Sequence, residues 1–250
     1  MPTPRAGTAA PSLEGRIAVV TGASSGIGRA IALALAERGA ALVLLGREPA
    51  PLELVATEVR GSGCRVWTQA ADLTNEDAIA RIAAILEEGP GGVDILVHSI
   101  GRFSTGATDS ASVDEFDAIY RTNVRAPFLI TQQLLPTLRA RKGQIVFINS
   151  SVVAGARRGV GQYAASKFAL KGLADSLRDE VNPDGVRVLS VYPGRTATPM
   201  QEAIFEAEGR SWEPEKLLQP EDVAAIVLAS LTLPRTAEVT ELHIRPMQGP

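Results

Sequence analysis

The sequence predicts a single α/β domain with a doubly wound, mostly parallel sheet of about seven strands flanked by helices. Two observations support this fold class. Short apolar runs alternate with longer helical patterns over the 250 residues, and no Pro-, Gly- or Ser-rich linker or internal repeat interrupts the alternation. The first six runs are rich in leucine and β-branched residues and carry few charges, which is typical of strands covered on both faces.

Strands are expected at the apolar runs, and helices at the stretches between them. The predicted strands cover residues 16–21, 41–46, 64–69, 93–98, 144–149, 186–192 and 239–244. The predicted helices include residues 26–38, 74–88, 112–139, 161–182 and 220–232, the third with a break around Pro127. Because doubly wound sheets hold ligands beyond the carboxyl ends of their strands, we expect the site in the loops that follow the strands.

The ends of the chain and its cysteine content narrow the class of protein. Residues 1–13, rich in Pro, Ala, Gly and Thr, predict a flexible tail without the apolar core of a signal peptide, and residues 14–250 the single folded domain. No run approaches the roughly 18 apolar residues of a membrane span. The lone Cys64 excludes an internal disulfide and favours a reducing compartment, so we expect a cytoplasmic protein.

Charge and metal-ligating residues exclude several kinds of partner. The net charge of −3 gives no support for nucleic acid or an anionic membrane as the main partner. Cys64, His98 and His243 are scattered along the chain and form no cluster of zinc ligands, so we expect no metal. A small molecule is the expected ligand.

A glycine-rich turn, "TGASSGIGRA", follows the first predicted strand and precedes the first predicted helix. Gly22, Gly26 and Gly28 allow a tight turn and a close approach of the backbone to a pyrophosphate, whose charge suits a helix N-terminus. The spacing G-x3-G-x-G differs from the general G-x-G-x-x-G fingerprint, and a plain turn is the alternative. The position between a buried strand and a helix favours a nucleotide site.

The end of the second predicted strand, "LVLLGRE", bears on the choice of dinucleotide. A site for NAD usually offers Asp or Glu here to the ribose 2′-hydroxyl, but Gly46 and Arg47 occupy the position. A guanidinium suits a 2′-phosphate, so we expect NADP(H) to be preferred, with NAD(H) as an option. A surface arginine near Glu48 is the alternative.

The segment "ADLTNEDA" follows the third predicted strand. Thr74 with Asp77 three residues later predicts a helix cap. Asp72, just before that cap, is either an acceptor for an adenine amine or a plain loop carboxylate.

Tyr163 and Lys167 lie four residues apart, on one face of the predicted helix 161–182. A phenol has an unperturbed pKa of about 10, and a nearby ammonium is expected to lower it and ease proton exchange at neutral pH. The upstream pair Ser150 and Ser151 offers hydroxyls that can hold a substrate oxygen without adding charge. Two polar residues on an ordinary amphipathic helix are the alternative.

Three segments, in order and suitably spaced, make the chain resemble the short-chain dehydrogenase/reductase (SDR) family over almost all residues after about residue 13. "TGASSGIG" (21–28) resembles the family motif TGxxxGxG, "YAASK" (163–167) resembles YxxxK, and "PGRTATPM" (193–200) is similar to the PGxxxT segment. The resemblance implies a Rossmann-type fold and an oxidoreductase that transfers a hydride between NADP(H) and a carbonyl or secondary alcohol.

The resemblance also implies a catalytic set of Asn123, Ser150, Tyr163 and Lys167. Tyr163 would exchange a proton with a substrate oxygen that Ser150 polarises. Lys167 would lower the pKa of Tyr163 and bind the nicotinamide ribose, and Asn123 would hold a water. Ser150 lies at the usual family spacing before Tyr163, and Ser151 is the alternative. The implied cofactor contacts, which include Tyr163 and Lys167, are Gly22, Ser24, Ser25, Gly26, Ile27, Gly28, Arg47, Asp72, Leu73, Ser99, Gly101, Pro193, Gly194 and Thr198.

The chain departs from the family pattern at two places. "HSIG" (98–101) stands where the family has NNAG; Gly101 is kept, and we expect His98 to be a core residue and not a catalytic one. The end, "VTELHIRPMQGP", lacks the glycine-rich ending common in the family. The family usually forms homo-tetramers or homodimers through two long helices, here near 112–139 and 161–182.

A helical substrate flap is expected near residues 195–213. Its apolar residues either line a pocket or form the packing face of the flap, and they are Met200, Ile204, Phe205 and Trp212. Arg157 and Arg158, between Ser150 and Tyr163, either face the mouth of the pocket and favour an anionic substrate or form a solvated pair.

The expected function is therefore that of an NADP(H)-dependent reductase or alcohol dehydrogenase with a small-molecule substrate. One alternative is a 3-oxoacyl-[acyl-carrier-protein] reductase, which "LRARKG" (138–143) favours and "NPDG" (182–185) does not. The other is a dinucleotide-sensing module without catalysis, against which the complete catalytic set argues.

Overall fold

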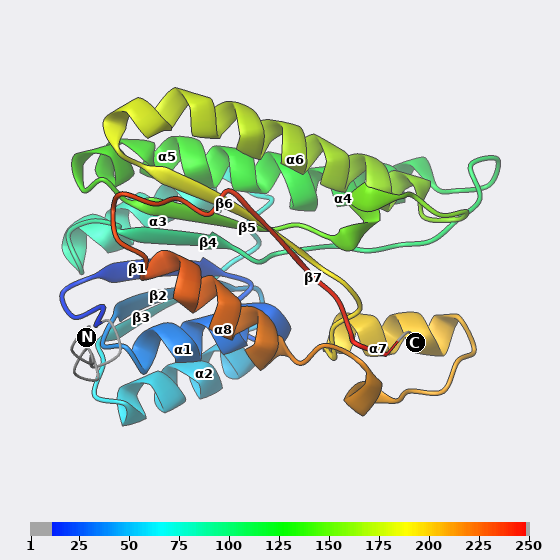
Figure 1. Cartoon of the computed structure of the whole chain (residues 1–250), viewed down its shortest axis with the longest axis horizontal. Coiled ribbons are helices and arrows are strands. Elements are labelled where there is room, and N and C mark those ends of the chain that lie inside the picture. The colour runs from blue at the N-terminus through cyan, green and yellow to red at the C-terminus, as the bar shows by residue number, and fades with distance from the viewer. Residues whose placement is uncertain (1–11, 249–250) are drawn as a thin grey trace, which may run out of the picture.

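A seven-stranded parallel sheet forms the centre of the molecule and confirms the predicted fold class. The computed structural model describes residues 12–248, apart from the side chain of residue 87, and its strands follow the order β3-β2-β1-β4-β5-β6-β7. Every neighbouring pair is parallel (Figure 1). The order reverses between β1 and β4, and in sheets of this kind ligands bind at the reversal, beyond the carboxyl ends of the strands.

All seven strands coincide with the predicted runs to within two residues at each end. They are β1 (Ile17–Thr21), β2 (Ala41–Gly46), β3 (Val66–Ala70), β4 (Ile95–His98), β5 (Gln144–Ile148), β6 (Arg187–Pro193) and β7 (Glu241–Ile244). Five of them are buried along their whole length, whereas the edge strands β3 and β7 are half-buried for most of theirs. This burial explains why the inner strands carry so few charges.

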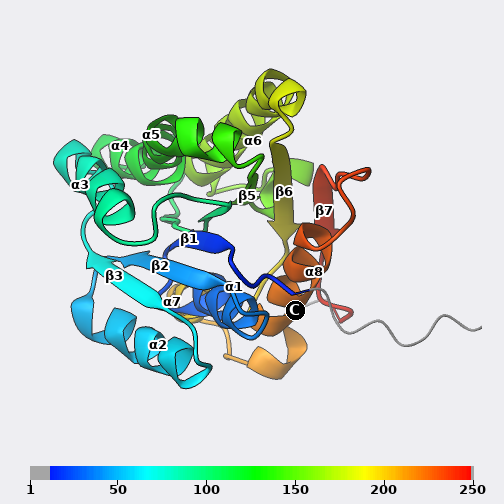
Figure 2. The ribbon, with the colours of Figure 1, turned by 90° about the vertical axis from the view of Figure 1, so that its left-hand side faces the viewer.

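Helices cover both faces of the sheet, with α1, α2 and α8 on one face and α3, α4, α5 and α6 on the other (Figure 2). Their bounds are α1 (Gly26–Ala36), α2 (Pro49–Gly61), α3 (Glu76–Glu88), α4 (Val113–Tyr120), α5 (Ala126–Ala140), α6 (Gly161–Val181), α7 (Pro199–Ala207) and α8 (Pro220–Leu231). The helix α2 is absent from the predicted set, because Pro49 and Pro51 are typical of loops. Proline also suits the first turn of a helix, where the N–H has no partner, and that is where Pro49 lies.

The predicted helix 112–139 is two helices joined by a π-helical turn, Arg121–Arg125. The expected break is confirmed, and its place is just before Pro127, which is the second residue of α5. Proline lacks the N–H that would continue an α-helical ladder, so the preceding turn is widened. Asn123 lies inside this turn.

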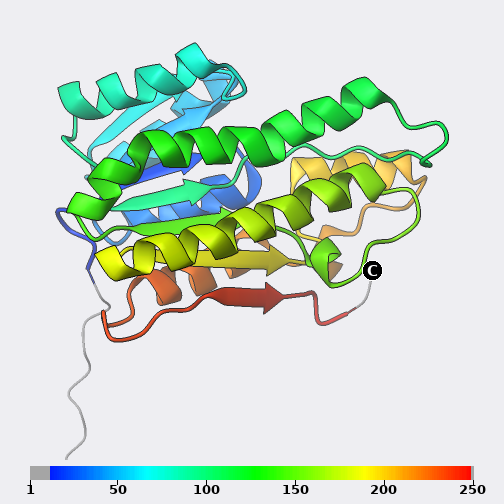
Figure 3. The same ribbon diagram turned by 90° about the horizontal axis from the view of Figure 1, so that it is seen from above.

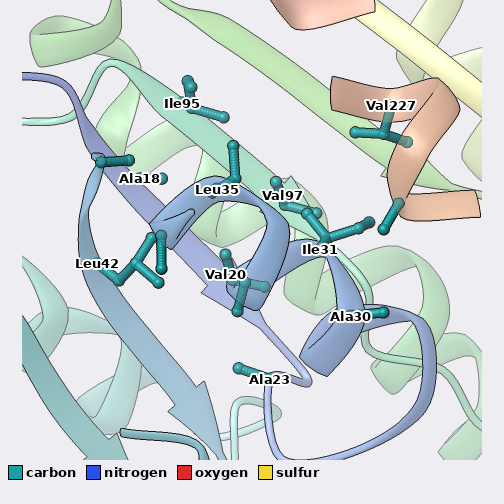
Figure 4. Packing of buried hydrophobic residues seen from close by; sticks show 14 of the residues in the cluster. Ala18, Val20, Ala23, Ala30, Ile31, Leu35, Leu42, Ile95, Val97 and Val227 are labelled. Carbon is teal, nitrogen blue, oxygen red and sulfur yellow. The ribbon is translucent and has the colours of Figure 1, made fainter. Parts of the chain in front are cut away.

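Two apolar clusters, one on each face of the sheet, hold the strands in register. In the cluster that Figure 4 shows, Ile31 and Leu35 of α1 pack against Val20 and Leu42 of the sheet and against Val227 of α8. Each leucine or isoleucine buried in this way contributes about 1.5–3 kcal/mol. The packing fixes α1, and with it the glycine turn at the start of α1.

The folded part of the chain begins earlier than predicted. Residues 1–11 of the expected tail lie outside the described residues. Leu13 is buried, and its N–H donates to the carbonyl of Arg38 at 2.7 Å, so residue 13 belongs to the domain and not to a tail. Among residues 12–248, no helix combines the length and the hydropathy needed to span a lipid bilayer.

Candidate active site

A cavity of about 1470 Å³ opens at the carboxyl ends of the strands. It is lined by residues of the glycine turn, of the loops after β2 to β6, of α7 and of the segment after β7. All but three of the predicted site residues line this cavity. Gly26, Gly28 and Asn123 are the exceptions.

Close backbone packing explains two glycines of the turn. A Cβ on Gly28 would lie 2.3 Å from the carbonyl oxygen of Gly22, and a Cβ on Gly22 would lie 2.8 Å from that of Ser99. Gly22 also has a φ of +65°, which residues with a side chain rarely adopt. The turn therefore presents bare backbone at the start of α1, and a dinucleotide pyrophosphate fits this cradle.

Arg47 and Asp72 face the same part of the cavity from the loops after β2 and β3. The carboxylate of Asp72 accepts hydrogen bonds from the N–H and the hydroxyl of Thr74, at 2.9 and 2.8 Å. These two bonds, more than the charge of Arg47, hold the pKa of Asp72 below its ordinary value. Asp72 therefore stays an anion, and Arg47 is the cation beside it.

The predicted helix cap at Thr74 is wrong by one residue. The first residue of α3 is Glu76, and the side chain of Asn75 accepts from the N–H groups of Asp77 and Ala78 at 2.8 and 3.3 Å. Thr74 bonds Asp72 instead. Asn caps as well as Thr does, so the motif alone did not decide between the neighbours.

Tyr163 and Lys167 share the cavity wall on the first two turns of α6. The ammonium of Lys167 donates to the carbonyl of Ile148 at 3.1 Å and lies 5.8 Å from the ring centroid of Tyr163. Burial lowers the pKa of Lys167 to about 8. Lys167 is thus a buried cation whose only hydrogen-bond acceptor among the described residues is a backbone carbonyl.

The pKa of Tyr163 is raised, contrary to the prediction that Lys167 lowers it. Burial against the cavity wall is the main cause, and the hydroxyl of Ser150 opposes it by hydrogen bonding. Desolvation of the phenolate outweighs the attraction of an ammonium nearly 6 Å from the ring. Tyr163 therefore keeps its proton at neutral pH.

Of the two serines after β5, Ser150 is the one beside Tyr163. Its backbone is extended, with φ −161° and ψ 148°, and its hydroxyl accepts from the N–H of Val152 at 3.2 Å. Ser151 starts a short 3-10 helix and is exposed, although it also lines the cavity. The geometry favours Ser150 as the partner of Tyr163.

Asn123 is fully buried. Its amide donates to the carbonyl of Arg102 and to the hydroxyl of Ser166, both at 2.9 Å, and its carbonyl oxygen accepts from the N–H of Arg102 at 2.7 Å. The hydroxyl of Ser166 in turn donates to the carbonyl of Tyr163 at 2.7 Å. Asn123 thus ties the loop after β4 to the helix that carries Tyr163.

His98 is a core residue, as expected. It is stacked on Phe147 with ring centroids 4.8 Å apart, and its Nε2 lies 2.8 Å from the hydroxyl of Thr131. Burial lowers its pKa to about 3. The neighbouring Ser99 donates its N–H to the hydroxyl of Thr21 at 3.0 Å, which links the end of β4 to the end of β1.

The predicted flap corresponds to α7 and the loop after it, and its apolar residues divide between the two expected roles. Met200 and Ile204 line the cavity, and the Met200 methyl lies 3.7 Å from where a Cβ of Gly101 would be. Phe205 is buried inside the flap, edge-on to Trp212 at 5.4 Å. Pro193 and Gly194, which the sequence predicts as cofactor contacts, lie at and just after the end of β6 and line the cavity.

The segment after β7 adds lining residues that were not predicted from the sequence, and they are Arg245, Pro246 and Gln248. The pairing of Pro193 with Ile244 brings this segment against the loop after β6, so that a Cβ on Gly194 would lie 3.0 Å from Pro246. A prediction that β7 pairs with β6 would have placed these three residues at the cavity. Within residues 12–248, no group of three or more His, Cys, Asp and Glu side chains is arranged to hold a metal ion.

A glycine turn at the reversal of strand order, in one cavity with a tyrosine, a lysine and a serine, is typical of a nucleotide-binding protein. A family model described as short chain dehydrogenase matches residues 16–209. The chain therefore belongs to the short-chain dehydrogenase/reductase family and is an oxidoreductase acting on CH–OH or C=O groups.

Relatives and solved structures agree with this assignment. An uncharacterized oxidoreductase of Staphylococcus aureus strain USA300 is 33% identical over 94% of this chain and 99% of its own length. An alcohol dehydrogenase from the archaeon Thermococcus sibiricus, complexed with 5-hydroxy-NADP, is 30% identical, with a TM-score of 0.84 over 94% of this chain and 98% of that one. A metagenomic short-chain oxidoreductase in complex with NADP is 32% identical, with a TM-score of 0.81 over 95% and 99%.

Proposed function

We propose that this chain is an NADP(H)-dependent reductase of a ketone or aldehyde, or the corresponding alcohol dehydrogenase, with Tyr163 as the general acid and base. One observation carries the proposal. The hydroxyls of Tyr163 and Ser150 meet in the same cavity as the ammonium of Lys167 and the glycine turn. A substrate oxygen held by the two hydroxyls would lie within reach of a dinucleotide on the turn.

The cofactor residues are proposed from the cradle and its neighbours. The N-terminus of α1 and the bare backbone of the turn hold the pyrophosphate, and Arg47 pairs with the 2′-phosphate of NADP. The NADP and 5-hydroxy-NADP complexes of similar chains support this preference. When bound, the reduced dinucleotide supplies the hydride.

The proton comes from the chain. The raised pKa of Tyr163 keeps the phenol protonated at neutral pH, which suits donation to a carbonyl oxygen that gains negative charge. Ser150 donates a second hydrogen bond to that oxygen, and Lys167 holds the ribose hydroxyls. Asn123 acts by position, since both hydrogens of its amide are already donated to Arg102 and Ser166.

A titration of protein fluorescence with NADPH, and separately with NADH, tests the cofactor part of the proposal. Arg47 should give NADPH an affinity advantage of roughly 10- to 100-fold, since hydrogen bonds to a charged group contribute about 1.5–3 kcal/mol. Oxidation of NADPH with a panel of ketones and aldehydes then tests the reaction. Equal affinities would remove the NADP preference, and absence of oxidation with every carbonyl would remove the reductase.

The 3-oxoacyl-[acyl-carrier-protein] reductase remains the second candidate, because the actinorhodin polyketide ketoreductase with NADPH is 29% identical with a TM-score of 0.84. The basic segment 138–143 supports this second candidate less than the sequence alone predicts. Arg139 pairs with Asp184 at 2.8 Å, and Arg141 pairs with the buried Asp94 at 3.2 Å. Both guanidiniums are therefore partly neutralised and less suited to an acidic carrier protein.

We also propose a homo-oligomer, supported by the large apolar side chains that α4, α5 and α6 expose. They are Val113, Phe116, Tyr120, Phe128 and Phe168, which are 45–74% exposed.

A further inference from the structure

The cavity is cationic although the chain as a whole is acidic. The chain has a net charge of −3. Among the residues that the structure describes, eight cationic side chains line the cavity against three carboxylates, those of Glu48, Asp72 and Glu208. The cations are Arg47, Arg102, Arg121, Arg157, Arg158, Lys167, Arg195 and Arg245. Such an excess raises the local concentration of anionic ligands.

Three of these arginines already have carboxylate partners. Arg195 donates to both oxygens of Glu208 at 3.1 Å. The guanidinium of Arg102 forms two bonds to Glu115, at 2.6 and 3.2 Å, and that of Arg121 lies 3.7 Å from the carboxylate of Asp117. These three are not the source of the charge excess.

Three more cations lie in the part of the cavity where NADP(H) is proposed to bind, which is called the cofactor part. Arg47 faces Asp72, Lys167 lies beside Tyr163, and Arg245 packs against Gly194, where a Cβ would be 3.3 Å from the Arg245 Cα. The proposed NADP(H) accounts for charge in this part. Arg157 and Arg158 remain, exposed and without a salt bridge to any described residue.

Arg157 and Arg158 lie in a loop that leads directly from Ser150 to Tyr163. The loop is fixed at the rim: the carbonyl of Gly159 accepts from the N–H of Gly106 at 2.8 Å, and the amide of Gln162 donates to the Ser104 hydroxyl at 3.3 Å. The loop after β5 and the loop after β4, which contains Ser104 and Gly106, lie at the end of the sheet to which the strands point (Figure 3). The loop that carries the two exposed guanidiniums is therefore anchored beside the cavity that both arginines line.

Apolar side chains from the loops after β4 and β5 and from α7 line the same cavity as Tyr163, and the ring centroid of Phe103 lies 4.9 Å from that of Tyr163. These apolar side chains are Phe103, Val152, Val160, Met200 and Ile204. A substrate that fills this space has its carbonyl at the Tyr163 hydroxyl, an apolar segment along the wall, and its far end among the guanidiniums.

From this arrangement we infer that the substrate is a ketone or aldehyde with an anionic acid group, a carboxylate or a phosphate, separated from the carbonyl by an apolar segment. Arg157 and Arg158 bind that acid group, because a guanidinium offers paired donors to carboxylate and phosphate alike. The inference rests on the proposed function for the identity of the reacting group.

The test compares one aliphatic ketone skeleton that ends in a carboxylate, a phosphate monoester, a methyl ester or an ammonium group. With NADPH at low ionic strength, kcat/KM for an anionic form should exceed that for the ester by about tenfold, and the ammonium form should be poorest. Added salt should reduce the difference, since both arginines are exposed. The better of the two anions identifies the acid group.

The double variant Arg157→Gln/Arg158→Gln should lose the preference for the anion by the same factor of about ten, so that the anionic forms and the ester react at similar rates. Arg81→Gln, an exposed arginine of α3, is the matched control and should behave as the wild type. Equal rates for ester and anions in the wild type, or an unchanged preference in the double variant, would overturn the inference.

Calorimetric binding of the four ketones to the cofactor-free protein separates this inference from the proposed function. If no ketone is reduced but the anionic forms bind more tightly than the ester, and the double variant loses that difference, the reductase fails and the anion site stands. If the ketones are reduced without any preference for an anion, the reductase stands and the anion site fails.

Discussion

The cavity has a cofactor half, beside the glycine turn, and a substrate half, beside the flap and the loop that carries Arg157 and Arg158. These two halves are built in different ways. The cofactor half rests on main-chain packing: Gly28 touches Gly22, and Gly22 touches Ser99, at distances that leave no space for a Cβ. The substrate half rests on side-chain contacts within loops and the flap. The guanidiniums of Arg195 and Arg210 both contact the ring of Phe205, at 4.9 and 4.5 Å from its centroid.

Side chains of the flap bind one another, and the base of the flap is joined to the segment before α8. Glu208 accepts from both arginines, at 3.1 and 3.2 Å, and thereby completes the enclosure of Phe205. At the base, Thr196 bridges Leu218, and the Ala197 N–H donates to the Leu218 carbonyl at 2.7 Å. Side chains of the flap can therefore change without disturbing the sheet, which places substrate choice in the part of the fold that tolerates variation.

The first prediction concerns the stability of the core beneath the cofactor half, where His98 is buried. The lowered pKa of His98, about 3 in the folded chain against 6.5 ordinarily, means that the unfolded chain binds more protons between these values. Stability from the neutral His98 is present above pH 6.5 and should fall by up to about 1.4 kcal/mol per pH unit as the pH drops below that. Urea unfolding at several pH values measures the slope.

His98→Asn should flatten this slope, because Asn does not titrate. His243→Asn, which alters an exposed histidine, is the control and should keep the loss seen in the wild type. A slope in His98→Asn as steep as that in the wild type would show that other groups cause the acid sensitivity.

The second prediction tests the main-chain packing itself. Gly28→Ala puts a methyl 2.3 Å from the Gly22 carbonyl and should cost about 1–3 kcal/mol of stability together with most NADPH affinity. Gly61→Ala, at the end of α2 with no atom within 4 Å, should be neutral or stabilising. Thermal unfolding and NADPH titration measure both; equal effects of the two variants would contradict the close-packing explanation.

The third prediction tests whether Arg47, within the cofactor half, binds the 2′-phosphate of NADPH. Arg47→Gln should weaken NADPH binding by roughly 10- to 100-fold and leave NADH binding unchanged, since only NADPH carries the 2′-phosphate. The fluorescence titration measures both affinities, with Arg81→Gln as control. A parallel loss for NADH would mean that Arg47 holds the loop and not the phosphate.

The fourth prediction concerns the substrate half alone. Phe205→Ala removes the ring that two guanidiniums contact and should lower kcat/KM for a ketone by about tenfold, with NADPH affinity changed by less than about threefold. Leu54→Ala, which truncates a leucine that is 68% exposed, is the control. Steady-state kinetics decide; an equal loss of NADPH affinity would mean that the two halves are not independent.

The features that were predictable from the sequence are those set by local pattern. Buried strands repeat apolar residues, the glycine turn must follow a strand, and a spacing of four puts Tyr163 and Lys167 on one helical face. Features that depend on contacts between residues far apart in the sequence were either not predicted or predicted wrongly. Arg245 reaches the cavity only through the pairing of β6 with β7, and the pKa of Tyr163 depends on how much protein surrounds the ring.

The most direct test of the proposed catalytic site is Tyr163→Phe, assayed for reduction of a ketone by NADPH in a single turnover. Loss of the proton donor should slow the reaction by about 10²- to 10⁴-fold, while NADPH affinity and thermal stability stay near those of the wild type. Tyr120→Phe, on the exposed side of α4, should react as the wild type does. A Tyr163→Phe protein that reduces the ketone at the wild-type rate would contradict the assignment of Tyr163 as the acid.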